Sequence, residues 1–262
     1  MRVRLRFSKL GKIRFTSHRD VARMFERAFR RTGLPVAYSG GFAPRPKVSF
    51  GLALPTGAES VAEYLDVELS RHVDPAALPG SLSPALPVGV DVTAAAAVDG
   101  RAPSLQQEVT SCVWVVELPE LGEAAVASLA GETLAARTLA ATRERKGKPV
   151  TDDLRPAIIS LTADGTTLTF ELATQPRGVR PTEVLGVVRP DIEIGAVRRI
   201  NQWIERDGAR CDPMEVDPAA TDAPERNEHV RAGSPTGGDL DAPVDPDGGL
   251  RLTQPRAQAA AG

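Results

Sequence analysis

The chain has 262 residues, of which 42% are hydrophobic and 25% are charged, a composition typical of a soluble globular protein. No apolar run approaches the roughly 20 residues of a membrane span, and the N-terminus is charged from its second residue, so we expect a cytoplasmic protein without a membrane partner. Two cysteines are too few for a disulfide framework or a thiolate cluster, and three scattered histidines show no metal-ligand spacing. The composition therefore predicts neither a metal nor a cofactor.

The net charge of −2 conceals two segments of opposite sign. Residues 1–50 contain 13 lysines and arginines but only two acids, a balance of +11. Residues 212–262 contain four arginines and ten acids, a balance of −6. A segment as basic as the first is a candidate for binding a polyanion such as RNA.

The first predicted strand, residues 2–7, alternates strictly between arginines and apolar side chains. Its basic face would consist of Arg2, Arg4 and Arg6. If that face of the sheet is open, the arginines form a positive platform for a nucleic-acid backbone. If the strand at 63–69 lies alongside, Asp66 and Glu68 pair with at most two of them. A second short strand is expected at residues 13–15.

Residues 17–32 are predicted to form a helix, with Ser17 as its N-cap and Gly33 and Pro35 marking its end. The buried stripe of this helix would consist of Val21, Phe25, Ala28 and Phe29. Arginines follow at helical spacing on another face, namely Arg19, Arg23, Arg27, Arg30 and Arg31.

The segment YSGGFAPRPKVSF, residues 38–50, contains no acid, and we call its first part (residues 38–47) the glycine loop. Adjacent glycines let backbone amides point at one centre, and prolines stiffen the chain, so a loop of this kind with flanking cations suits a phosphate. The alternative is a plain hairpin connection in which the glycines only supply positive φ angles.

The fold class predicted from the element order is α+β, with two tandem ferredoxin-like units. Strands at 47–54 and 63–69, a proline-interrupted helix around 74–86 and a strand around 88–97 complete a β-α-β-β-α-β unit over residues 1–105. Helices would cover one face of its sheet and leave the other open.

The second unit is expected over residues 106–206, in a similar order. Its predicted elements are strands at 111–118, 137–148, 157–163 and 166–172, helices at 121–135 and 181–188, and a closing segment at 195–205. Residues 207–262 are acidic, rich in proline and glycine and poor in large apolar side chains, so we predict a disordered tail.

The candidate phosphate- or RNA-binding residues lie just before the predicted helix, on that helix and on the glycine loop: Lys12, Arg14, His18, Arg19, Arg23, Arg27, Arg30, Arg31, Ser39, Gly40, Gly41, Arg45 and Lys47. Tyr38, Phe42 and Phe50 are placed to stack on bases. A second cationic segment, residues 143–156, is explained by a solvated hairpin turn or by a further RNA contact.

An alternative set of catalytic residues comprises His18, Tyr38 and Lys47, which could act as metal-free acid and base groups in RNA cleavage. The competing interpretation of His18 is structural, because a single histidine at a helix start often bonds a neighbouring loop.

Residues 9–69, KLGKIRFTSHRDVARMFERAFRRTGLPVAYSGGFAPRPKVSFGLALPTGAESVAEYLDVEL, closely resemble the radical-SAM-linked protein family. The matching positions are Lys12, Arg14, Phe15, Ser17, His18, Asp20, Arg27, Arg30, Arg31, Pro35, Ser39, Gly41, Phe42, Pro44, Pro46, Lys47, Glu63, Tyr64 and Asp66. The RERKGK and DLRP stretches match too, so the resemblance covers roughly residues 1–206.

The resemblance implies a domain that is fused behind radical SAM enzymes or encoded as a separate chain. A radical SAM enzyme needs three closely spaced cysteines for its cluster, and this chain has two that are far apart, so it resembles the stand-alone form. Such forms tend to be encoded beside a ribonuclease E/G-type enzyme, and both associations point towards RNA.

Three functional hypotheses follow from the sequence. The first is an RNA-binding or substrate-presenting accessory module that works with an RNA-modifying radical SAM enzyme or a ribonuclease E/G-type partner. The second is a metal-independent endoribonuclease, similar in architecture to the CRISPR repeat-processing enzymes. The third is a protein–protein adaptor that uses the basic face.

Overall fold

The computed structural model of the chain describes residues 1–99, 102–206 and 208–215. Strands predominate over helices in these residues, so the fold is mixed α+β. The helices are α1 (His18–Thr32), α2 (Leu78–Leu82), α3 (Leu105–Glu108), α4 (Glu123–Ala135) and α5 (Pro181–Val188). Within the described ranges, no helix has the length and apolar character needed to cross a membrane.

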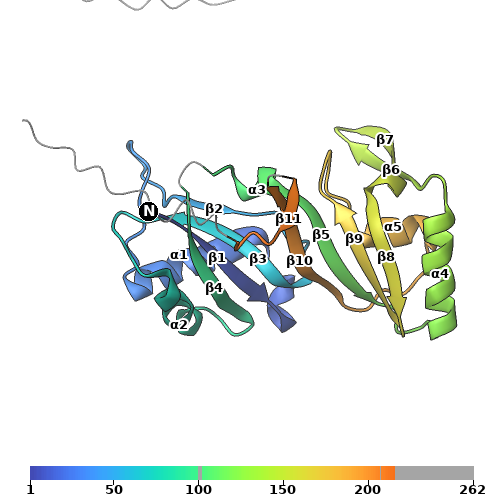
Figure 1. The fold of residues 1–262 in the computed structure, drawn as a ribbon, viewed down its shortest axis with the longest axis horizontal. Coiled ribbons are helices and arrows are strands. Elements are labelled where there is room, and N and C mark those ends of the chain that lie inside the picture. Colours follow the sequence, from blue (N-terminus) through green and yellow to red (C-terminus); the bar gives the residue numbers. More distant parts are fainter. Residues whose placement is uncertain (100–101, 207, 216–262) are drawn as a thin grey trace, which may run out of the picture. The chain divides into compact units, whose positions relative to one another are not determined.

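One large sheet is built from nine strands of the described residues, in the order β4-β1-β3-β10-β5-β9-β8, with β2 paired to β3 and β11 paired to β10 (Figure 1). The strands are β1 (Arg2–Lys9), β2 (Val48–Phe50), β3 (Glu59–Glu68), β4 (Val90–Val98), β5 (Val109–Glu117), β8 (Ile158–Asp164), β9 (Thr167–Ala173), β10 (Val197–Arg206) and β11 (Ala209–Cys211). The sequence therefore predicted the α+β class, but the predicted units share a sheet instead of each having its own.

A separate two-stranded hairpin is formed by β6 (Ala140–Arg145) and β7 (Lys148–Asp153). Its turn has positive φ angles of 52° at Lys146 and 75° at Gly147, which suit a tight hairpin turn. The hairpin interpretation of the cationic segment at 143–156 is therefore confirmed, whereas an RNA contact there stays a prediction.

The junction between the two halves of the sheet is parallel and carries ion pairs. In the register of β3 and β10, Arg198 lies opposite Glu59 and Arg199 opposite Ser60. Arg198 Nη2 lies 2.7 Å from Glu59 Oε2, and the buried Arg199 Nη2 lies 2.7 Å from Glu63 Oε1. The described residues accordingly belong to one compact unit, in which each half contains a large hydrophobic cluster.

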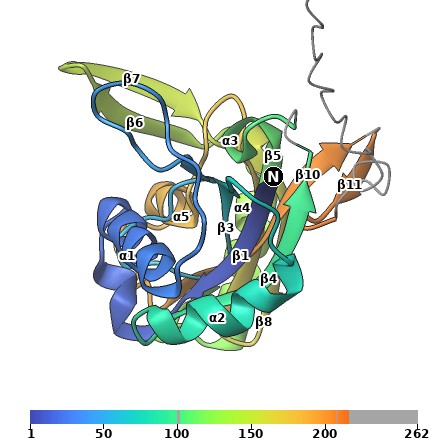
Figure 2. The same cartoon turned by 90° about the vertical axis from the view of Figure 1, so that its left-hand side faces the viewer.

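Helix α1 forms as predicted and lies beside β1 and β3, as Figure 2 shows. The hydroxyl of Ser17 accepts a hydrogen bond from the backbone N–H of Asp20 at 3.2 Å, and Gly33 ends the helix with a φ of 65°. Its buried residues are Val21, Phe25, Ala28 and Phe29, which confirms the predicted stripe.

Of two other predicted elements, the first is wrong and the second is confirmed. Residues Gly11–Phe15 form a 3₁₀ helix, so the short strand predicted at 13–15 is wrong; Gly11 adopts a φ of 70°, which turns the chain out of the extended conformation directly after β1. The proline-interrupted helix predicted around 74–86 is confirmed: α2 lies between two 3₁₀ turns, and prolines occur at 75, 79 and 84.

The arginine row on β1 does not form an open platform. The guanidinium of Arg4 is buried, with Nε 2.8 Å from Asp66 Oδ1, Nη2 3.0 Å from Glu108 Oε2 and Nη1 3.0 Å from the Pro213 carbonyl. Arg2 also binds Asp66, and Arg6 Nη1 lies 3.7 Å from Asp212 Oδ2. The open-face interpretation is wrong, because α3 and residues 212–215 cover this side of the sheet with acids and carbonyls.

The start of the predicted tail is ordered. Strand β11 pairs with β10, Asp212 accepts a hydrogen bond from the Tyr64 hydroxyl at 3.3 Å, and Met214 packs against Tyr64 and Leu105. The tail was predicted to begin at residue 207, but residues 208–215 belong to the folded part of the chain. Residues 216–262 of the predicted tail lie outside the described residues.

Candidate nucleic-acid interface

The arginine face of α1 is exposed along the whole helix. Its members are Arg19, Arg23, Arg27, Arg30 and Arg31. One ion pair between described residues reaches this face, that of Arg23 with Asp20 at 3.5 Å, and both side chains are about half exposed. A hydrogen bond from Ser17, with a smaller contribution from Arg23, holds the pKa of Asp20 below its usual value. Most of the arginines on α1 therefore have no ion pair with another described residue.

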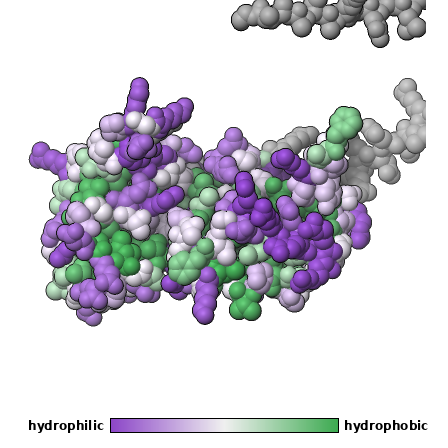
Figure 3. All heavy atoms as spheres, turned by 180° about the vertical axis from the view of Figure 1, so that it is seen from behind, coloured by the Kyte–Doolittle hydropathy of each residue, from purple (hydrophilic) through white to green (hydrophobic). Residues whose placement is uncertain are grey.

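The molecular surface agrees with this distribution of polar groups. Figure 3 shows the molecule from behind the view of Figure 1. On this face, hydrophilic side chains gather on the half that carries α1. Three aromatic side chains near the cations are exposed rather than packed in the core: Phe15, Tyr38 and Phe42. Phe42 is fully exposed at the tip of the glycine loop. Exposed cations next to exposed aromatic rings are typical of surfaces that bind single-stranded nucleic acid.

The glycine loop is closed at its base by backbone pairing. Tyr38 and Pro46 form a β-bridge, and the Ser39 N–H donates to the Arg45 carbonyl at 2.8 Å. The loop backbone is thus hairpin-like, and Gly41 has a φ of 106°, which favours glycine. Within the described part of the chain, the amides from Gly40 to residue 43 have no hydrogen-bond partner. The loop can therefore be a hairpin and still present free donors to an anion.

Some candidate cations are held by acids. Lys47 Nζ lies 2.7 Å from Glu68 Oε2 in an exposed pair, so the predicted pairing of Glu68 with the β1 arginines is wrong. Arg14 Nη1 lies 3.5 Å from Glu59 Oε1, and its guanidinium covers the ring of Phe15 at 4.8 Å. Lys12 and Arg45 are exposed, with no ion pair to another described residue. These two are the freer cations outside α1.

The candidate residues divide between the two ends of α1. His18 packs edge-on against Phe50 at the start of the helix, with ring centroids 5.0 Å apart. Tyr38 lines a groove with Arg30, twelve residues further along α1, which corresponds to about 18 Å. Among the described residues, no hydrogen bond joins His18, Tyr38 and Lys47. The structure thus places these three in different surroundings, and the catalytic set stays a prediction.

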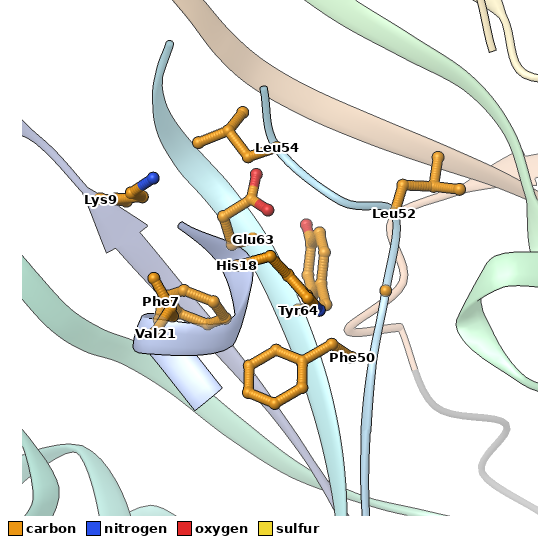
Figure 4. A pocket seen from close by; sticks show the side chains of 10 residues that line it. Phe7, Lys9, His18, Val21, Phe50, Leu52, Leu54, Glu63 and Tyr64 are labelled. Carbon is orange, nitrogen blue, oxygen red and sulfur yellow. The ribbon is translucent and has the colours of Figure 1, made fainter. Parts of the chain in front are cut away.

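A small cavity beside His18 contains two charged residues that the sequence did not single out as site residues, Lys9 and Glu63 (Figure 4). Its volume of about 20 Å³ is enough for about one water molecule. Lys9 Nζ donates to the carbonyls of Arg14 and Thr16 at 3.2 and 2.9 Å, and burial lowers its pKa. Glu63 accepts two hydrogen bonds from Arg199 at 2.9 and 2.8 Å. Both charges are therefore used mainly to hold the start of α1 and the sheet junction.

No signal in the sequence could have found this cluster. Lys9 follows a register shift in β1, and Arg199 lies 136 residues from Glu63 along the chain. Such pairings depend on the assembled sheet.

A protein-family model matches residues 2–181, and its description is "Uncharacterized protein conserved in bacteria (DUF2344)". The chain belongs to the DUF2344 family. The region matched to DUF2344 runs from β1 to the first residue of α5 and includes the arginine face, the glycine loop and the cavity beside His18. A search of curated proteins found no match to the chain.

Proposed function

We propose that this DUF2344 chain is an RNA-binding accessory module that presents RNA to a separate enzyme. The observation that carries the proposal is the arginine face of α1, where five arginines are exposed and, among the described residues, only Arg23 has an ion pair, with Asp20. A solvated helix face usually mixes charges of both signs, so this imbalance favours a polyanionic ligand.

The exposed aromatic residues favour RNA over an acidic protein as the ligand. Phe15, Tyr38 and Phe42 offer exposed ring faces on which unpaired bases can stack. Two of the rings lie near cations, since Arg14 covers the Phe15 ring and Tyr38 lines a groove with Arg30. An acidic protein partner would use the cations but has no general need for exposed rings.

The strand order supports two ferredoxin-like halves within the sheet, and this arrangement is part of the proposal. Counting the sheet strands of each half in chain order, both halves have the spatial order fourth, first, third, second: β4-β1-β3-β2 and β10-β5-β9-β8. Residues 1–105 and 106–206 would then be two βαββαβ units whose sheets are fused at β3 and β10.

The enzyme served by the module is proposed to be an RNA-modifying radical SAM enzyme or a ribonuclease E/G-type enzyme. This chain has two cysteines, Cys112 and Cys211, of which Cys112 is buried, so it lacks the thiolates that hold an iron–sulfur cluster. A chain of this kind would contribute RNA binding, and its partner would contribute the chemistry.

The salt dependence of RNA binding tests the proposed function. With the full chain and a labelled single-stranded RNA, we expect the logarithm of the affinity to fall with the logarithm of salt concentration with a slope of about −3 or steeper, because at least four phosphates are neutralised. The RNA should remain uncut during incubation without metal. No binding at low salt, or a flat salt dependence, would contradict RNA binding, and metal-independent cleavage that is lost in His18→Ala would establish the endoribonuclease alternative instead.

A further inference from the structure

A groove of about 190 Å³ lies between the second half of α1 and the glycine loop. Its apolar lining consists of Phe29, Leu34, Val36, Pro44 and Pro46. Three polar side chains complete it: Glu26, Arg30 and Tyr38. A protein cavity of about 150 Å³ is enough to bind benzene, so the groove has room for an aromatic ring.

The polar groups of the groove have no partner among the described residues. Glu26 and Arg30 are four residues apart on α1, yet no ion pair joins them, and the Tyr38 hydroxyl makes no hydrogen bond there. Glu26 is half-buried, and a carboxylate that is partly removed from water without a donor is unfavourable. A ligand that donates a hydrogen bond to the Glu26 carboxylate would replace the water contacts that this carboxylate has lost.

The ligand that matches these groups is flat, with apolar faces, and carries donors and an acceptor along one edge. A nucleobase has this form, and its edges are free only when it is unpaired. A carboxylate accepts two hydrogen bonds side by side, and guanine presents two adjacent donors, N1–H and the N2 amine, next to its O6 acceptor. Uracil presents one donor between two carbonyls, which would face the carboxylate unfavourably.

We propose that this groove binds one unstacked guanine base of single-stranded RNA, an inference that rests on the RNA-binding function proposed above. The base stacks on Tyr38, donates from N1 and N2 to Glu26, and accepts at O6 from Arg30. The module is then not a uniform polyanion binder, because it selects single-stranded segments that contain guanine.

The test compares labelled single-stranded RNAs of about twelve nucleotides, a length within the usual site size of such proteins. All positions are uridine except a central one, which is guanosine, inosine or uridine. With the full chain, we expect the guanosine probe to bind roughly fivefold or more tightly than the uridine probe, with inosine between them because it lacks the N2 amine.

Variants of the groove separate recognition from general affinity. Glu26→Gln keeps the side-chain shape and should remove the preference for guanosine while leaving binding of the uridine probe equal or slightly tighter. Tyr38→Ala should weaken both probes, whereas Tyr38→Phe should bind like the wild type. Glu120→Gln, at an exposed acid in the second half of the chain, controls for the change in net charge.

The outcomes distinguish the groove from the function on which it rests. If no probe binds at low salt, both proposals fail. If the probes bind but do so equally, or if the guanosine preference survives Glu26→Gln, the guanine groove is overturned while RNA binding stands.

Discussion

Removal of four exposed arginines from α1 is expected to weaken RNA binding by about 100-fold, because each lost phosphate contact reduces affinity by roughly three- to fivefold. The four are Arg19, Arg23, Arg27 and Arg31. Glutamine is the suitable replacement, since it keeps a polar side chain with similar helix propensity while removing the charge. The salt slope should become shallower by about three, because about four phosphates are no longer neutralised.

The matched control removes two exposed arginines from the second half of the chain, Arg137 and Arg189. We expect this variant to bind RNA within about threefold of the wild type, since only long-range charge is lost. Fluorescence anisotropy gives the affinities, and circular dichroism checks that the helix content is retained. If both variants weaken binding in proportion to the charge removed, the ligand is attracted by net charge and α1 is not its site.

Substitution of Asp66 with alanine is expected to lower the free energy of unfolding by about 3–5 kcal/mol. Asp66 is buried and accepts hydrogen bonds from Arg2 and Arg4, so its removal leaves two guanidiniums in the protein with too few acceptors. Arg4 retains Glu108 and the Pro213 carbonyl, which limits the loss. Urea unfolding measures the change.

Glu68→Ala is the matched control, because Glu68 lies two residues further along β3 and also pairs with a cation. Its pair with Lys47 is exposed, with 46% and 48% of the two side chains accessible, so we expect a change of about 0–1 kcal/mol. Should Asp66→Ala fail to fold, Asp66→Asn keeps two polar atoms and allows a measurement. Equal effects at positions 66 and 68 would contradict the buried ion-pair cluster.

The sequence was sufficient where the determining interactions are local. Helix α1 was predicted with its cap at Ser17, its end at Gly33 and its buried stripe, because capping and periodicity involve residues within a few positions of one another. The exposure of the arginine face follows from the same periodicity. The hairpin turn at Lys146 and Gly147 is another local feature that could be predicted.

The parts that could not be predicted depend on residues far apart in the chain. The predicted alternative in which Asp66 pairs with the β1 arginines is confirmed, because Asp66 binds Arg2 and Arg4. The contacts of Arg4 with Glu108 and Pro213, which lie 104 and 209 positions away, could not be predicted. The fusion of the two halves depends on Arg198 and Arg199, which bind acids of β3. Local patterns contain no information about which surfaces such distant segments cover.

In the candidate site, too, local features could be predicted and the positions of distant segments could not. The cations of α1 and the free amides of the glycine loop could be named from residue type, but their separation could not. His18 lies against Phe50 at one end of α1, and the loop meets Arg30 near the other, because the chain after the loop returns along β2. The candidate residues therefore do not form one cluster at His18 and the loop but are spread along the helix.

The most direct test of RNA binding by this surface is photo-crosslinking of the full chain to single-stranded RNA, with mass spectrometry to identify the crosslinked peptides. We expect crosslinks to fall in residues 12–47, with Phe15, Tyr38 and Phe42 as the expected aromatic positions, and to decrease as salt is raised. Crosslinks that fall only within residues 102–206, or that are unchanged in the four-arginine variant, would contradict RNA binding by α1 and the glycine loop.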